Sequence, residues 1–203
     1  MDFSPASLFS IALGIGLAAA TGFRVFLPLL VAAIAARSGW IPLTEGFSWL
    51  ASTPALLTLG TAAALETLAY YIPGVDHALD VLAAPATVAA GVIASASVMA
   101  DVPPGVMWPV AIIAGGGIAG LTKGSTALIR AKAGVATGGL ANPVVSTVET
   151  VGATGLSILA IAVPLICLVA VIALLVWVTR KAGRMVFGWR RAAASSRNSD
   201  HTG

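Results

Sequence analysis

VGATGLSILAIAVPLICLVAVIALLVWV, residues 151–178, is a stretch of 28 residues without a charged side chain. A helix needs about 20 consecutive apolar residues to cross the hydrocarbon core of a bilayer. This stretch is long enough to cross it, and Pro164 within it predicts a kink or a marked tilt. The stretch therefore decides the fold class, which we predict to be all-α with helices that span a membrane.

The remainder of the chain has the same apolar character. Of its 203 residues 58% are hydrophobic and 9% are charged, and the mean hydropathy is +0.98. Apolar runs predict four further spans, near residues 8–36, 54–72, 81–100 and 106–130. We therefore expect residues 1–180 to form a polytopic transmembrane helical bundle of about five spans. Their short connections leave no room for a soluble catalytic domain.

Positive charge is concentrated at the carboxy-terminal end. Residues 180–203 carry six Lys and Arg side chains and one aspartate. Basic residues that flank a span are enriched on the cytoplasmic side of membranes. We expect residues 181–203 to be a disordered cytoplasmic tail in contact with anionic lipid. The basic net charge of the chain describes this tail and does not indicate nucleic acid binding.

The two halves of the chain resemble each other weakly. Residues 11–27 and 112–128 share six identities, and Glu66-Thr67-Leu68 resembles Glu149-Thr150-Val151. With this spacing of spans the two copies would cross the membrane in opposite directions, which is an inverted repeat of the kind found in transporters. The pattern predicts broken helices at residues 20–24 and 121–125. Alternatively, the shared small residues only allow close helix packing.

Four ionisable residues interrupt the apolar stretches: Arg24, Glu66, Lys123 and Glu149. A charge at the bilayer centre costs about 2.5–3.5 kcal/mol on insertion scales, so each of them needs a partner or water. Arg24 and Glu66 lie at comparable depth and can neutralise each other, and Lys123 and Glu149 invite the same pairing. Two interpretations remain open, structural ion pairs and the lining of a substrate or ion pathway.

A short polar segment, here called the acidic turn, lies between the second and third apolar stretches and contains Asp76, His77 and Asp80. Pro73 and Gly74 end the preceding helix, so Asp76 is placed to cap the next helix and Asp80 falls in its first turn. The spacing also brings the three side chains within reach of one cation at the mouth of a pathway. Capping explains both aspartates, and we predict neither a metal nor a cofactor.

Three motifs together resemble a known family. They are GLAAATGFR at residues 16–24, IPGVDHALD at 72–80 and AGLTKG at 119–124, with Asn142-Pro143 and Glu149 beyond them. Over residues 8–178 the chain resembles the small bacterial integral membrane proteins grouped as domain of unknown function 4126. The family pattern contains both aspartates of the acidic turn but not a fixed histidine at position 77. The resemblance implies a location in the bacterial inner membrane and does not imply an activity.

The orientation of the spans poses a conflict. With the tail inside, five spans place Arg130 and Lys132 outside, against the enrichment of basic residues in cytoplasmic loops. Either the segment 8–36 or the segment 106–130 is re-entrant, or this loop is an exception.

The sequence favours a small transporter or channel-like permease for a small solute or ion. The four buried charges would line its pathway and the acidic turn would shape one mouth. Because so few helices rarely enclose a pathway alone, we expect a homodimer in the lipid bilayer. One alternative is a structural or assembly factor that binds partner membrane proteins. The other is a lipid-modifying enzyme that uses the acidic turn; since no nucleophile or phosphate loop accompanies it, we predict that the protein is not an enzyme.

Overall fold

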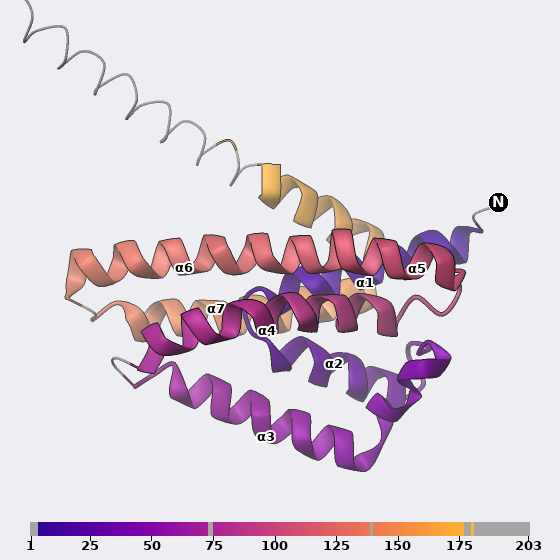
Figure 1. Cartoon of the computed structure of the whole chain (residues 1–203), viewed down its shortest axis with the longest axis horizontal. Helices are drawn as coiled ribbons and strands as arrows, with labels where there is room; N and C mark the ends of the chain where they lie inside the picture. Colours follow the sequence, from indigo (N-terminus) through magenta and orange to yellow (C-terminus); the bar gives the residue numbers. More distant parts are fainter. Residues whose placement is uncertain (1–3, 73–74, 139, 177–179, 181–203) are drawn as a thin grey trace, which may run out of the picture. The chain divides into compact units, whose positions relative to one another are not determined.

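The computed structural model describes residues 4–72, 75–138, 140–176 and 180, and the side chains of residues 75–78, 80 and 81 lie outside the described part. The chain divides into two units, residues 1–169 and 170–203, and the labelled helices in Figure 1 belong to the first. The described residues contain helices and no strand, which confirms the predicted all-α class. The predicted tail, residues 181–203, lies outside the described residues.

The helical elements of the described residues follow one another with short connections: α1 (Pro5–Thr21), α2 (Phe26–Arg37), the 3₁₀ helix η1 (Glu45–Ala51), α3 (Thr53–Ala69), α4 (Val75–Ser97), α5 (Pro104–Val110), the π-helical η2 (Ala111–Gly116), α6 (Gly117–Thr137) and α7 (Asn142–Ala162). A further apolar helix covers Pro164–Val176. Ser4 and Ser52 cap α1 and α3, because each hydroxyl accepts a hydrogen bond from the backbone N–H three residues later. Gly138, with φ +60°, ends α6 in the left-handed region.

Two predicted spans correspond to single helices. The span near 54–72 is α3, and the span near 81–100 is α4, which begins six residues earlier at Val75. The span near 106–130 is part of a longer helical stretch, because α5, η2 and α6 follow one another from Pro104 to Thr137 without a gap.

The last predicted span, residues 151–178, is broken. Helix α7 ends at Ala162, and at Val163 the backbone leaves the helical region with φ −144° and ψ 74°. Pro164 accounts for this, since its ring disfavours a helical conformation at the preceding residue. The predicted kink is therefore a complete break between two helices.

The first predicted span, residues 8–36, is wrong, because it is a hairpin of two helices. Helix α1 ends at Thr21 and α2 begins at Phe26, which confirms the predicted break at residues 20–24. Figure 1 shows α2 running back in the direction from which α1 came.

Hydrogen bonds place both ends of this hairpin at the connection between α4 and α5. Near the start of α1, the Ser7 hydroxyl donates to the Asp101 carbonyl at 2.8 Å and the Ser10 hydroxyl to the Asp101 carboxylate at 2.9 Å. Shortly after α2, the Thr44 backbone N–H donates to the Ser97 carbonyl at 2.8 Å. The hairpin thus begins and ends at the same end of the first unit.

The second predicted break, at residues 121–125, is wrong, since α6 is continuous there. The irregular turn lies about three turns earlier, in η2. The tip of the α1–α2 hairpin packs against α6 at the level of Ala119 and Thr122. A Cβ atom at Gly22 would lie 2.3 Å from Thr122 Cβ, so only glycine permits this approach.

Candidate functional site

Arg24 lies at the tip of the α1–α2 hairpin and is completely buried. Its Nε donates to Thr150 Oγ1 at 3.1 Å, and its Nη2 donates to the Ser146 carbonyl at 2.9 Å and to the Ser146 hydroxyl at 2.5 Å. The same Nη2 lies 3.8 Å from Glu149 Oε2. All these partners lie on the first three turns of α7. The hairpin therefore carries a guanidinium into the interior, and α7 receives it.

Glu66 binds the backbone of the hairpin and not the Arg24 guanidinium with which we expected it to pair. Its two carboxylate oxygens accept the backbone N–H groups of Val25 at 2.8 Å and Phe26 at 3.1 Å. These groups begin α2, whose own N-cap residue, Val25, provides no side-chain cap. The first N–H groups of a helix have no intrahelical partner and carry partial positive charge, so a carboxylate stabilises them. Glu66 of α3 thus caps α2 from 40 residues away.

Three cationic side chains lie around the Tyr70 ring. The guanidinium carbons of Arg24 and Arg130 lie 4.3 and 4.4 Å from the ring centroid, and the Lys123 ammonium lies 5.2 Å from it. Lys123 Nζ also donates to the Tyr70 hydroxyl at 2.8 Å. Only 2% of the Tyr70 side chain is exposed. At such distances the negative face of an aromatic ring attracts cations, most strongly where water is excluded.

Among the described side chains around these three cations, Glu149 is the carboxylate that pairs with the arginines. Arg130 Nη2 donates to Glu149 Oε2, the oxygen that Arg24 also approaches. Arg130 and Glu149 are buried, with 1% and 4% of their surface exposed. Removing one partner of a buried ion pair costs about 3–5 kcal/mol, because the other charge stays buried. We call Arg24, Tyr70, Lys123, Arg130 and Glu149 the Tyr70 cluster.

The sequence identified three members of the Tyr70 cluster, Arg24, Lys123 and Glu149, and it missed Tyr70 and Arg130. Both could have been predicted from their helical spacing to residues that were identified. Tyr70 follows Glu66 by four residues and Arg130 follows Lys123 by seven, so each lies on the same helix face as a residue that was predicted. Arg130 was assigned instead to a loop, because we expected the helix to end there.

The acidic turn falls largely outside the described side chains. The backbone places Asp76, His77 and Asp80 in the first two turns of α4, which begins at Val75. Asp76 is therefore inside the helix and not at the cap position that we predicted. Their roles at a pathway mouth remain predictions. Among the side chains that the structure describes, no three His, Cys, Asp or Glu residues lie together as metal ligands.

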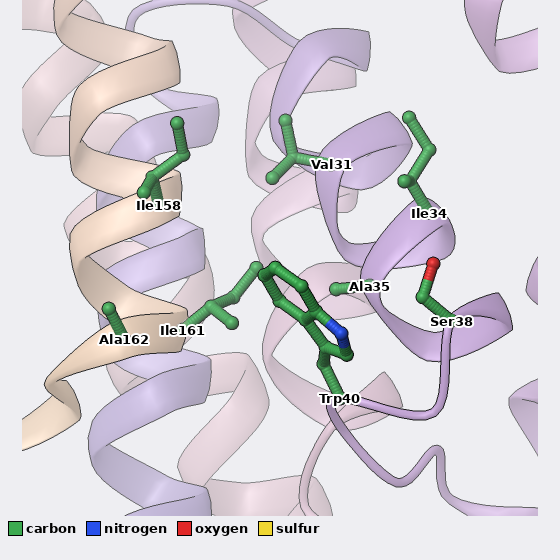
Figure 2. Close-up of a pocket in the computed structure, with 8 residues that line it drawn as sticks. All are labelled: Val31, Ile34, Ala35, Ser38, Trp40, Ile158, Ile161 and Ala162. Atoms are coloured by element: carbon green, nitrogen blue, oxygen red, sulfur yellow. The ribbon is translucent and has the colours of Figure 1, made fainter.

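Two apolar cavities adjoin the α1–α2 hairpin. The first, of about 440 Å³, lies between the start of α2, α3 and α4, and Glu66 and Tyr70 are the polar residues among the described side chains that line it. Tyr70 of the Tyr70 cluster lines it. The second, of about 510 Å³, lies between the ends of α2 and α7. Figure 2 shows the Trp40 ring across this space, with Ile161 of α7 on one side and Ala35 of α2 on the other.

These features define a class, an all-helical protein with a buried cluster of charges. Within the described residues two of its helices, Pro104–Thr137 and Asn142–Ala162, are long and apolar enough to cross a membrane, judged by length and composition. The model of the family described as a domain of unknown function, DUF4126, matches residues 11–184, and the chain belongs to this family. The comparison with curated proteins gave no match, and neither did the comparison with solved structures.

Proposed function

We propose that this chain is a multi-pass membrane protein that acts as a small transporter or channel-like permease, with a pathway through the Tyr70 cluster. The distribution of polarity supports the membrane setting. Leu57, Leu65 and Leu128 are each more than 60% exposed, whereas Arg24 and Arg130 are at most 1% exposed. A protein in water shows the opposite arrangement. Lipid would cover the apolar surface.

The hydroxyl groups on the helices support the same setting. Those of Thr61, Thr67, Ser125 and Thr147, for example, each donate to the carbonyl four residues earlier in their own helix. This bond satisfies the hydroxyl without water. In a bilayer core, where unsatisfied polar groups are costly, a helix can carry such residues on its lipid face.

One observation carries the proposal of a pathway. Cationic side chains from the α1–α2 hairpin and α6 converge on one ring at the end of α3, and Glu149 of α7 pairs with two of them, inside a largely apolar protein. Ion pairs that only hold helices together can be replaced by apolar packing without loss of stability. Intramembrane charges therefore point to a substrate or ion pathway by default. The re-entrant hairpin with Arg24 at its tip matches the broken helices that form such sites in transporters.

The proposal includes a homodimer in the bacterial inner membrane with a cytoplasmic tail. It does not depend on an inverted repeat. Contacts between the halves favour a repeat, since Arg24 of the first half approaches Glu149 of the second and Lys123 of the second binds Tyr70 of the first. The unbroken α6 opposes it, because the matching segment of the first half is a hairpin.

The test is solute flux into proteoliposomes that contain the purified full chain. The probes are sodium, potassium, chloride and acetate salts, followed by light scattering as the vesicles swell. We expect flux above that of empty vesicles, reduced about tenfold or more by Arg24→Gln and by Glu66→Gln, because each removes a charge-assisted hydrogen bond. The matched controls, Arg37→Gln and Glu45→Gln, change exposed charges and should leave flux unchanged. Flux through Arg24→Gln equal to that through the two controls would remove the Tyr70 cluster from the pathway.

The second candidate is the structural or assembly factor, and glycines on open helix surfaces favour it. A Cβ atom at Gly60 of α3 or Gly155 of α7 would meet nothing within 4 Å, which leaves room for the close approach of a partner's helix. In this case the vesicles would show no flux, and a partner membrane protein would co-purify with the chain in a fixed ratio.

A further inference from the structure

The long helical stretch from Pro104 to Thr137 contains one irregular turn, η2, in which each backbone hydrogen bond closes one residue later than in an α-helix. Such π turns are rare and occur frequently at functional sites. The sequence weakens a regular helix on both sides of it. Pro109 in α5 has no N–H group to donate, and each glycine at residues 115–117 costs about 1 kcal/mol relative to alanine. Residues 109–117 therefore have the lowest intrinsic helix stability in this stretch.

A buried hydroxyl without a partner lies against this turn. Ser95 of α4 is completely buried, and its Oγ has no hydrogen-bond partner in the described structure. A Cβ atom at Gly115 of η2 or at Gly14 of α1 would lie 3.0 Å from this oxygen, so Ser95 fills the crossing of the three elements. A buried polar group left without a partner costs about 1–3 kcal/mol. A second state of the protein in which water reaches Ser95 would remove this cost.

Two methionines form a chain of contacts from Ser95 to α5. Met99 Cε lies 2.9 Å from the position that a Cβ atom at Gly14 would take, so Met99 covers the same crossing as Ser95. Met99 packs in turn against Met107 of α5 in a small apolar cluster. Of the seven residues of α5, all of which the structure describes, Met107 is the one that is buried. Figure 1 shows α5 at the end of the unit where α1 begins. The two methionines therefore separate Ser95 from that end.

The helix that follows η2 is fixed more firmly than α5. A Cβ atom at Gly91 of α4 would lie 2.4 Å from Ala119 Cβ of α6, and one at Gly22 of the hairpin would lie 2.3 Å from Thr122 Cβ. These contacts join α6 to two neighbours almost backbone to backbone, so a change in η2 moves α5 instead. One residue accounts for about 100° of an α-helix with 3.6 residues per turn. Rewinding η2 as α-helix, which has one residue fewer in each hydrogen-bonded turn, therefore turns α5 by about 100°.

We infer that η2 is a hinge with a π form and an α form, and that α5 is the gate that it moves. In the π form, which the structure describes, Met107 closes the end of the bundle. In the α form Met107 leaves Met99, and water reaches the Ser95 hydroxyl. This inference rests on the proposed function, because it names the gate of the pathway that leads to the Tyr70 cluster. A π turn that serves packing alone would keep Ser95 dry.

The first measurement is the reactivity of a cysteine at position 95, in the full chain in detergent with Cys167 replaced by alanine. The probe is 2-aminoethyl methanethiosulfonate, a small cation that modifies thiols in contact with water, and the modification is followed by mass spectrometry. Ser97→Cys is the matched control, because Ser97 is equally buried on α4 but its hydroxyl donates to the Ala94 carbonyl. We expect Ser95→Cys to react at least about tenfold faster than Ser97→Cys, since opening exposes position 95.

The second measurement locks the hinge. Deletion of Ile113, a largely exposed residue of η2, lets an α turn join α5 to α6 in their present relative rotation and leaves no residue for a second form. We expect this variant to keep a thermal midpoint close to the native one and to bring the reactivity of Ser95→Cys down to that of the control. Deletion of Ile129, also exposed but within α6, removes a residue from a regular turn and should lower the midpoint, because it turns Arg130 away from Glu149.

Amide hydrogen exchange of the native chain tests the hinge without any substitution. The hydrogen bonds of η2 break whenever the turn rewinds, so amides at residues 111–117 should exchange at least about tenfold faster than those at 119–126, after correction for sequence. Equal protection of the two segments would overturn the inference. The Ile113 deletion should remove the difference, and a difference that persists in this variant would assign it to fraying of the short helix instead.

The remaining outcomes are equally decisive. Equal reactivity of the cysteines at positions 95 and 97 overturns the gate. Fast reaction at position 95 that survives the deletion overturns the role of η2, and so does a deletion variant that fails to fold, because the segment then has no α form. The proposed function is decided separately by flux. A reactive position 95 without flux in vesicles refutes the permease and keeps the hinge, whereas flux that persists in the deletion variant keeps the permease and removes η2 as its gate.

Discussion

Replacing Gly22 by alanine is the sharpest test of the packing of the α1–α2 hairpin, because this residue lies where the tip of the hairpin meets α6. A Cβ atom there would lie 2.3 Å from Thr122 Cβ, 2.7 Å from Thr122 Cγ2 and 2.8 Å from the Ala119 carbonyl oxygen. Two of these three atoms, the Cβ and the carbonyl oxygen, belong to or adjoin the backbone of α6, so a change of rotamer cannot remove the overlap. Gly22 itself has φ −65° and ψ −25°, a conformation that alanine adopts without strain. Any loss of stability therefore measures the contact with α6.

The expected loss follows from two opposing effects. Overpacking costs about 1–3 kcal/mol, and contacts this short with atoms that cannot rotate away place it near 3 kcal/mol. Replacing glycine by alanine also reduces the entropy of the unfolded chain, which offsets about 1 kcal/mol. The net free energy of unfolding should fall by about 2 kcal/mol, which lowers the melting midpoint by about 4–8 °C in a chain of this size.

The assay is thermal unfolding in detergent followed by circular dichroism, with Gly60→Ala as the matched control. Gly60 lies within α3, and a Cβ atom there would meet nothing within 4 Å. Its replacement by alanine should therefore stabilise the protein by about 0.5–1 kcal/mol, the helix propensity difference. A Gly22→Ala protein as stable as Gly60→Ala would show that the tip does not pack against α6.

Two further predictions concern topology and the cluster. In a Cys167→Ala background, single cysteines at positions 38 and 137 should react with a membrane-impermeant thiol reagent from opposite sides of the membrane. The reason is that Ser38 lies beside the end of α7, whereas Thr137 ends α6, shortly before α7 begins. Labelling of both cysteines from the same side would contradict this arrangement. Tyr70→Phe should keep the three cations in place and lower the free energy of unfolding by about 1–3 kcal/mol, because the Lys123 ammonium loses the Tyr70 hydroxyl as an acceptor inside the protein. An unchanged unfolding midpoint would exclude a buried hydrogen bond between Lys123 and Tyr70.

Local chemistry made several features predictable from the sequence. The uncharged run of residues 151–178 and the overall composition fixed the all-α class, since only helices bury their own backbone polar groups within such a segment. Arg24, Lys123 and Glu149 stood out as charges in apolar surroundings, and the structure brings these three together. The break at residues 20–24 was also visible, because Gly22 and the charged Arg24 interrupt an otherwise apolar run.

Only the tertiary structure decided the direction of the chain and the partners of its charges. A break in a helix does not say whether the chain continues or turns back, and in α1–α2 that choice follows from hydrogen bonds to Asp101 and Ser97. Glu66 caps a helix that begins 40 residues before it, so no pattern within α3 could reveal its partner. The sequence by itself determined which residues are too polar for the apolar interior. The fold determined where they meet, because pairing over long separations depends on the packing of whole helices.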